Sequence, residues 1–118
     1  MPPMTVVRRD DVALVRVVGD VDVAVSAEVE APILGSIRDA PVVVLDLSAV
    51  SFLDSAGLRL VDHVVGSCER RGVQIRVVAP EGSPARLPLR LCGFPLHLIA
   101  ASAAEALAET GRRGHLSG

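Results

Sequence analysis

Near the amino terminus, β-branched and apolar residues form two short runs with a polar turn between them. The runs cover Thr5–Arg8 and Val12–Val18, and Arg9-Asp10-Asp11 separates them. Such a pattern is typical of a β-hairpin. Gly19-Asp20-Val21-Asp22 follows, and we expect it to end the second strand, because glycine and aspartate favour turns over strand interiors.

A helical spacing of apolar residues comes next. Over residues 23–37 the pattern predicts a helix whose apolar positions are Val25, Val29, Ile33 and Ile37. Pro32 lies inside this stretch. Proline lacks the N–H that a helix interior needs, so we expect it to kink or restart the helix.

The most hydrophobic run of the chain covers residues 42–47 and favours a central strand buried on both faces. Residues 48–54 are interpreted as a connecting loop. Residues 56–71 then form the clearest helical pattern, with Gly72 as a left-handed residue that ends it. The apolar stripe of this helix consists of Leu58, Val61, Val64, Val65 and Cys68.

The remaining segments continue the alternation of strand and helix. We expect a strand over residues 73–79, a short irregular helix limited by Pro88, and a short strand over residues 96–99. Ser102-Ala103-Ala104-Glu105 is a capping box that opens a helix over residues 103–109. Residues 111–118 are expected to form a flexible tail.

This order predicts one α/β domain over residues 1–118, with a core of about residues 4–110. Its sheet should be mixed, with about five strands and about four helices packed on it.

Composition narrows the classes of function. The chain is 50% hydrophobic, has a mean hydropathy of +0.47, and contains two Phe but no Trp or Tyr. Stacking of nucleic-acid bases needs aromatic faces, and the net charge of −2 offers no excess of cations for a phosphate backbone. We therefore expect no nucleic-acid partner. The chain has no lysine, which excludes Schiff-base catalysis on a lysine.

Metal, cofactor and membrane roles also lack support in the sequence. Cys68 and Cys92 are far apart in the sequence and form no C-x-x-C pair. We expect both to act as small, buried apolar side chains, and we expect neither a metal site nor a cofactor. No stretch approaches the roughly 20 apolar residues of a membrane span. The first residues lack the pattern of a signal peptide. We expect a cytoplasmic protein with no membrane partner.

Ser55 lies at the junction between the predicted strand and the helix over residues 56–71. We expect it to be the N-cap, a role worth about 1 kcal/mol that by itself needs no further function. Gly57 follows in the first turn, where its missing side chain would let another protein approach the backbone. Phe52 and Leu53 precede the junction, and large apolar residues in a loop are typical of a buried or a contact surface.

A phosphate on Ser55 would add about −1.5 to −2 charges. The dipole and the free N–H groups of the helix amino terminus would stabilise that charge, while Asp54 would oppose it. The fold should therefore tolerate the phosphate. A docked partner would not, because an unpaired buried charge costs several kcal/mol.

Two catalytic or ligand-binding alternatives have weaker support. A serine hydrolase needs a histidine beside Ser55, but His63 is on the same helix at about 12 Å along its axis, and His97 and His115 are in later segments. Leu53 also occupies the first glycine position of a G-x-S-x-G elbow. Nucleotide binding would rest on Gly57 alone, without a G-x-G-x-x-G or Walker pattern. We expect no enzymatic activity.

Residues 42–58, which end in Asp54-Ser55-Ala56-Gly57-Leu58, resemble the signature of STAS domains, and in particular of bacterial anti-sigma factor antagonists. Gly19-Asp20-Val21-Asp22 resembles the family's Gly-acidic-apolar-Asp element after the second strand. Arg90-Leu91-Cys92-Gly93-Phe94 resembles its closing segment before the last strand. The similarity covers roughly residues 4 to 110, so it implies the STAS fold.

The resemblance implies a switch. In the family, the unmodified protein binds an anti-sigma factor that is also a serine kinase, and this binding frees the sigma factor. The kinase phosphorylates the serine after the signature aspartate, here Ser55, which releases the partner, and a metal-dependent serine phosphatase resets it. Asp22 and Asp54 match positions associated with partner contact and with presenting the serine. The residues predicted to bind the partner are Asp22, Phe52, Leu53, Asp54, Ser55, Ala56, Gly57 and Leu58.

One alternative stays open within the family. A STAS domain can act purely as an interaction module, as a scaffold or a transport-system subunit, with the serine never modified. The presence of the acceptor Ser55 favours the switch. Ala56, where many relatives have Ser or Thr, and Pro32, in the first helix of the family fold, depart from the usual pattern.

Overall fold

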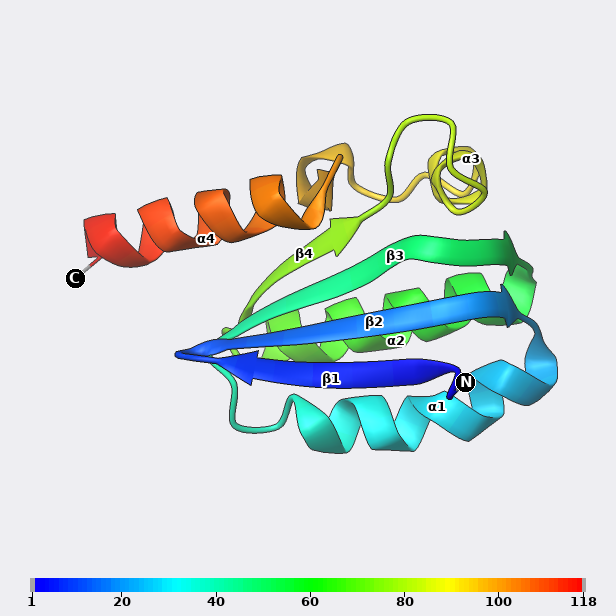
Figure 1. Ribbon diagram of the computed structural model, residues 1–118, viewed down its shortest axis with the longest axis horizontal. Helices are drawn as coiled ribbons and strands as arrows, with labels where there is room; N and C mark the ends of the chain where they lie inside the picture. The colour runs from blue at the N-terminus through cyan, green and yellow to red at the C-terminus, as the bar shows by residue number, and fades with distance from the viewer. Residues whose placement is uncertain (1, 118) are drawn as a thin grey trace.

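The computed structural model describes residues 2–117 of the chain. Within that range, strands and helices alternate after an initial hairpin (Figure 1). The elements, in chain order, are β1 Met4–Arg9, β2 Val12–Val21, α1 Val23–Ser36, β3 Val42–Leu53, α2 Ser55–Arg70, β4 Gln74–Val78, α3 Arg86–Leu91, the 3₁₀ helix η1 Leu96–Leu98, β5 Ile99–Ala100 and α4 Ala103–Ser117.

The described strands form one five-stranded sheet in the order β1-β2-β3-β4-β5. β1 pairs with β2 in the antiparallel direction, and the remaining pairs are parallel. The predicted α/β class and mixed sheet are therefore confirmed. β2, β3 and β4 run in one direction, and β2 and β3 end side by side at the right of Figure 1, whereas β4 ends opposite Asp46 of β3.

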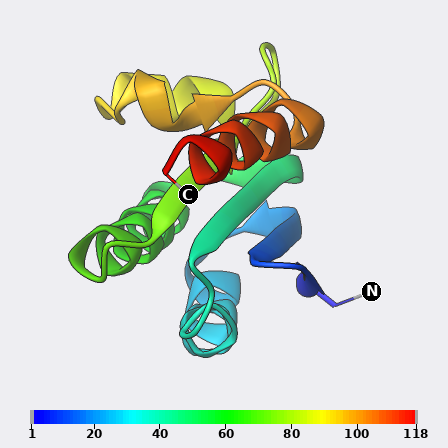
Figure 2. The same cartoon turned by 90° about the vertical axis from the view of Figure 1, so that its left-hand side faces the viewer.

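Two hydrophobic cores hold the helices on the sheet. The larger lies between the sheet and the pair α1 and α2, and it includes Val29 and Ile33 of α1, Val64 of α2 and Leu45 of β3. The smaller lies on the opposite face, where Ala106 of α4 packs with Val44 and Val78. Figure 2 shows α4 across the sheet from α1 and α2. The alternation of Val43, Val44 and Leu45 between the two cores explains why this strand reads as a continuous apolar run.

The structure corrects two strand boundaries next to Ser55. β3 continues through Leu53, although residues 48–54 were interpreted as a loop, and β2 continues through Val21, although its end was expected at Gly19. The two extensions pair with each other, ending on Val21 opposite Leu53. Irregularities in the register on both sides of Gly19, whose φ is +87°, allow the pairing to continue past residues that do not favour strands.

The carboxyl-terminal third also departs from expectation. Only Ile99–Ala100 pair as a strand, because Leu96–Leu98 form a 3₁₀ turn instead. The Ser102 hydroxyl caps α4 as predicted, accepting from the Glu105 N–H at 3.1 Å. The helix then runs through Ser117, past the predicted end at Glu109. Whether residues 111–118 are flexible stays a prediction.

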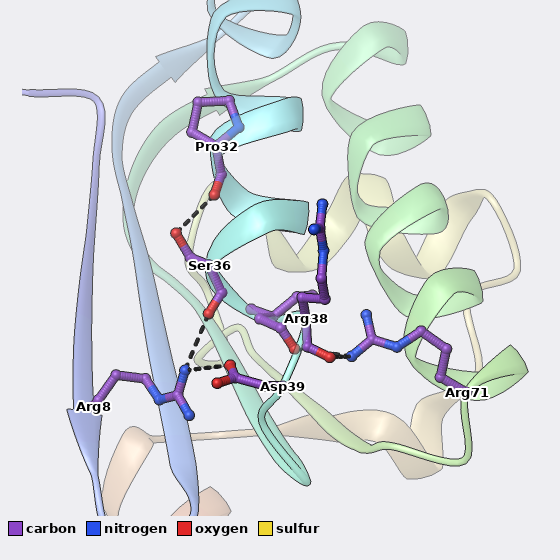
Figure 3. Close-up of polar contacts among 7 residues, drawn as sticks. Arg8, Pro32, Ser36, Arg38, Asp39 and Arg71 are labelled. Carbon is purple, nitrogen blue, oxygen red and sulfur yellow. Dashed lines mark hydrogen bonds and ion pairs between the residues drawn. The ribbon is translucent and has the colours of Figure 1, made fainter.

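Helix α1 runs without a break from Val23 to Ser36, so Pro32 does not restart it. The Ser36 hydroxyl donates to the Pro32 carbonyl oxygen at 2.7 Å (Figure 3). Arg8 of β1 donates to the Ser36 carbonyl oxygen at 3.3 Å, and Arg71 donates to those of Ile37 and Arg38. These arginines satisfy carbonyl groups that a helix end leaves free.

Candidate functional site

Two aspartates lie side by side in the topology, at the ends of β2 and β3. Asp22 follows Val21 and Asp54 follows Leu53, and Val21 and Leu53 are register partners. Each aspartate is the N-cap of the next helix. Asp22 Oδ1 accepts from the Val25 N–H at 2.9 Å. The two sites predicted from separate sequence elements are therefore brought together at one edge of the sheet.

Asp54, not Ser55, caps α2. Its Oδ1 accepts from the N–H groups of Ala56 at 2.9 Å and Gly57 at 3.0 Å. The prediction that Ser55 is the cap was wrong, because the extended backbone that a cap requires belongs to Asp54, with ψ of −170°. Ser55 is instead the first helical residue and is exposed. Its hydroxyl is thus not needed to satisfy the helix end.

Gly57 is buried against its own chain. A Cβ atom at this position would lie 2.5 Å from Leu53 Cδ1 and 3.0 Å from the Val21 carbonyl oxygen. The same carbonyl accepts from the Asp54 N–H at 3.4 Å. The glycine therefore lets the first turn of α2 pack onto the ends of β2 and β3, rather than leaving room for another protein. It fixes where Ser55 is presented.

The predicted partner-binding residues divide by exposure. Asp22, Phe52 and Ser55 are exposed; Asp54, Ala56 and Leu58 are half-buried; Leu53 and Gly57 are buried. Leu53 is only 5% exposed and packs in the larger core, whereas Phe52 is 52% exposed. Of the two large apolar residues before Ser55, only Phe52 therefore offers its side chain to a partner.

Three features of this edge are absent from the sequence prediction. Val23, which directly follows Asp22 and begins α1, is 69% exposed. The Ser51 hydroxyl donates to Asp20 Oδ1 at 3.0 Å and so bridges β3 and β2. Arg59 lines a groove between α1 and α2. Of these three features, only the position of Arg59 could have been predicted from the sequence, because it lies four residues after Ser55 on the same helix.

Most exposed large apolar residues of the described chain lie on segments that follow the carboxyl ends of the parallel strands. Phe52 is the second-last residue of β3 and Val23 begins the helix after β2, while the segment after β4 carries Leu87, Leu91 and Leu96. Open α/β sheets commonly bind their ligands at this edge. An exposed apolar group beside polar residues is typical of a protein interaction surface.

A larger cavity lies elsewhere. It has a volume of about 610 Å³ and is lined by the β1–β2 turn, Val42 at the amino end of β3, and Leu107 and Thr110 of α4. Val42 and Leu53 are the two ends of β3, so this cavity is at the opposite edge of the sheet from Ser55. It cannot serve chemistry at Ser55.

His63 does not activate Ser55. Its Nδ1 lies 2.8 Å from Glu30 Oε1 on α1, which joins the two helices. Over residues 2–110, whose side chains the structure describes, no group of three or more His, Cys, Asp or Glu side chains is placed to hold a metal ion. In the same range, no helix is both long and apolar enough to cross a membrane.

Comparisons with known proteins agree with this geometry. Residues 3–109 match the STAS domain family. The chain is 34% identical over 93 residues to the anti-sigma-F factor antagonist RsfB of Mycobacterium tuberculosis, covering 77% of this chain and 74% of that protein.

Two solved structures share the fold. An anti-sigma factor antagonist from Mycobacterium paratuberculosis superimposes with a TM-score of 0.79 at 30% identity, over 90% of this chain and 91% of that one. The phosphorylated form of the Bacillus cell fate determinant SpoIIAA gives a TM-score of 0.72 at 20% identity, over 91% and 98%. At that identity the likeness shows the fold alone. The chain therefore belongs to the STAS domain family, among relatives that are named anti-sigma factor antagonists.

Proposed function

We propose that this protein is an anti-sigma factor antagonist that acts by binding and performs no catalysis of its own. Its unmodified form binds an anti-sigma factor, and phosphorylation of Ser55 releases that partner. The observation that carries the proposal is the exposed Ser55, which α2 presents as its first residue beside the exposed Phe52. The names of the relatives support the anti-sigma factor as the class of partner.

The local electrostatics suit a switch. Asp54 has already satisfied two N–H groups of α2, so the backbone of the helix end would stabilise a phosphate on Ser55 mainly through the remaining helix dipole. Asp20, Asp22 and Asp54 place negative charge along the same edge. A phosphate would add about −1.5 to −2 charges to this edge. An apolar partner surface docked on Phe52 would have to bury the phosphate, which is costly.

The remaining partners follow from the same proposal. The anti-sigma factor would be the serine kinase that modifies Ser55, and a metal-dependent serine phosphatase would remove the phosphate. Because the kinase needs ATP, we place the cycle in the cytoplasm. In the kinase step the Ser55 hydroxyl accepts the γ-phosphoryl group of ATP and ADP leaves, and none of these steps asks the chain itself to bind a metal.

Mapping the phosphate tests the proposal. The chain is incubated with its candidate anti-sigma factor and ATP, and the product is analysed by mass spectrometry. We expect one phosphate on Ser55 and none in Ser55→Ala. Ser51→Ala is the matched control, because Ser51 is an exposed serine on the same edge, and it should be modified like the wild type. Phosphate elsewhere, or uptake by Ser55→Ala, would overturn the proposal.

A further inference from the structure

Arg59 lies one helical turn after Ser55 on α2, and both residues are exposed. Side chains four residues apart share one face of a helix, with about 5–6 Å between their Cβ atoms. Long side chains of a helix lean toward its amino terminus, so a residue at this position covers the turn that precedes it. Arg59 is therefore positioned to reach the Ser55 side chain.

The charge of Arg59 is not used elsewhere in the described chain. The ion pairs among the described side chains, residues 2–110, involve Arg8, Arg76, Arg86 and His63, and Arg59 takes part in none of them. The nearest competitor on its own helix is Asp62, three residues on, with which it forms no ion pair. A phosphate with nearly two charges is a stronger acceptor than one exposed carboxylate.

Arg59 also lines the groove of about 190 Å³ between the amino-terminal halves of α1 and α2, together with Val23 and Ala56. Ser26 lines the same groove, is 9% exposed, and its Oγ has no hydrogen-bond partner in the described chain. His63 belongs to the groove as well, but Glu30 pairs with it. Arg59 is thus the cation of this groove that no described side chain has neutralised.

We propose that Arg59 binds the phosphate of phosphorylated Ser55. This inference rests on the proposed phosphorylation of Ser55, and it adds Arg59 as the residue that binds the phosphate group. An acidic group one turn before a basic group is the more favourable order on a helix, and guanidinium can bind two phosphate oxygens at once. Phosphorylation then changes the surface twice: it adds negative charge at Ser55, and it withdraws the free cation of Arg59 from any partner.

The test uses protein in which phosphoserine is incorporated at position 55 during translation, so no kinase is required. The second pKa of the phosphate is measured by ³¹P NMR titration. Arg59 favours the dianion, so the pKa in the wild type should lie about 0.3 pH units below that in Arg59→Ala, the size set by an exposed pair one turn apart. Arg59→Lys should recover part of the difference.

Arg38→Ala is the matched control, because Arg38 is also exposed but lies past the carboxyl end of α1. It should leave the pKa unchanged. The proposal is overturned if Arg59→Ala titrates like the wild type, or if Arg38→Ala shifts the pKa as much. The two proposals can fail separately. A negative titration would reject the role of Arg59 without bearing on whether a kinase modifies Ser55. A negative kinase experiment would reject the modification, while the titration could still be interpreted because its phosphoserine is incorporated during translation.

Discussion

Asp22 and Asp54 occupy equivalent positions at the ends of neighbouring parallel strands, and each caps the helix that follows it. The pairing of Val21 with Leu53 places the two caps in register. As a consequence, Ser55 begins a helix in which the Asp54 side chain already accepts from two free N–H groups of the first turn. Asp54 therefore does the capping, and the proposed phosphorylation falls on the residue next to it.

Asp54→Ala should lower the free energy of unfolding by about 1 kcal/mol, because two N–H groups of α2 lose their acceptor. Asp54→Asn retains the acceptor oxygen and should cost much less. Chemical denaturation measures both. Equal losses in the two variants would show that the charge of Asp54, and not its capping bonds, supports the fold.

Gly57→Ala should destabilise the protein by about 1–3 kcal/mol, since the new methyl group would overlap Leu53 and crowd the Val21 carbonyl oxygen. Gly35→Ala is the matched control within a helix, with nothing within 4 Å of the added Cβ. It should be neutral or stabilise by up to about 1 kcal/mol. If both variants melt at the same temperature, the tight packing of α2 on the strand ends is contradicted.

Glu109→Ala should cost about 2 kcal/mol. It removes the partner of Arg76 Nε, at 3.1 Å, and the Arg76 side chain is only 3% exposed. The cost is below the 3–5 kcal/mol expected for fully buried pairs because Glu109 is 32% exposed. Glu81→Ala breaks a surface pair with Arg86 and should cost less than about 1 kcal/mol. A smaller loss for Glu109→Ala than for Glu81→Ala in urea denaturation would contradict this role.

Cys68 and Cys92 should differ in reactivity. Burial raises the pKa of the Cys68 thiol from 9.0 to about 11, whereas Cys92 is exposed. With a chromogenic disulfide reagent at pH 8, we expect one thiol to react quickly and the second only after unfolding. Cys92→Ser should abolish the fast phase. A fast phase that survives in Cys92→Ser would show that Cys68 is accessible.

The same pKa gives a pH dependence of stability. The thiol of Cys68 holds its proton more tightly in the folded state than in the unfolded state. Its contribution is therefore complete below pH about 9 and is lost as the pH rises toward about 11. Stability measured across that range should fall. A rise in stability over this pH range would contradict the upward shift of the Cys68 pKa.

Periodicity was sufficient for the elements that bury a continuous apolar face. The hairpin, the strand at residues 42–47 and the helix through Cys68 all follow from it, and Gly72 has the left-handed φ of +69° expected after the helix. The extensions of β2 and β3 could not be predicted this way. Ser48 and Ser51 favour a loop locally and are skipped in the register, and it is the pairing of Ala49, Val50, Phe52 and Leu53 with β2 that carries the strand through them.

The site was predicted in its position but not in its mechanics. Asp54 and Ser55 are both good caps by residue type, and the backbone conformation that chooses between them is set by where β3 ends. The burial of Leu53 and the fit of Gly57 depend on how α2 packs on the sheet. The groove beside Arg59 depends on the packing of α1 against α2, which no local pattern encodes.

Phosphorylation of Ser55 is proposed to act by lowering the affinity for the anti-sigma factor. Calorimetric titration of the cognate anti-sigma factor with the unmodified chain, with the chain carrying phosphoserine at position 55, and with Ser55→Ala measures that change directly. We predict that the phosphorylated chain binds about 100-fold more weakly or worse, and that Ser55→Ala binds like the unmodified chain. Equal affinities for the phosphorylated and unmodified chains would contradict the account.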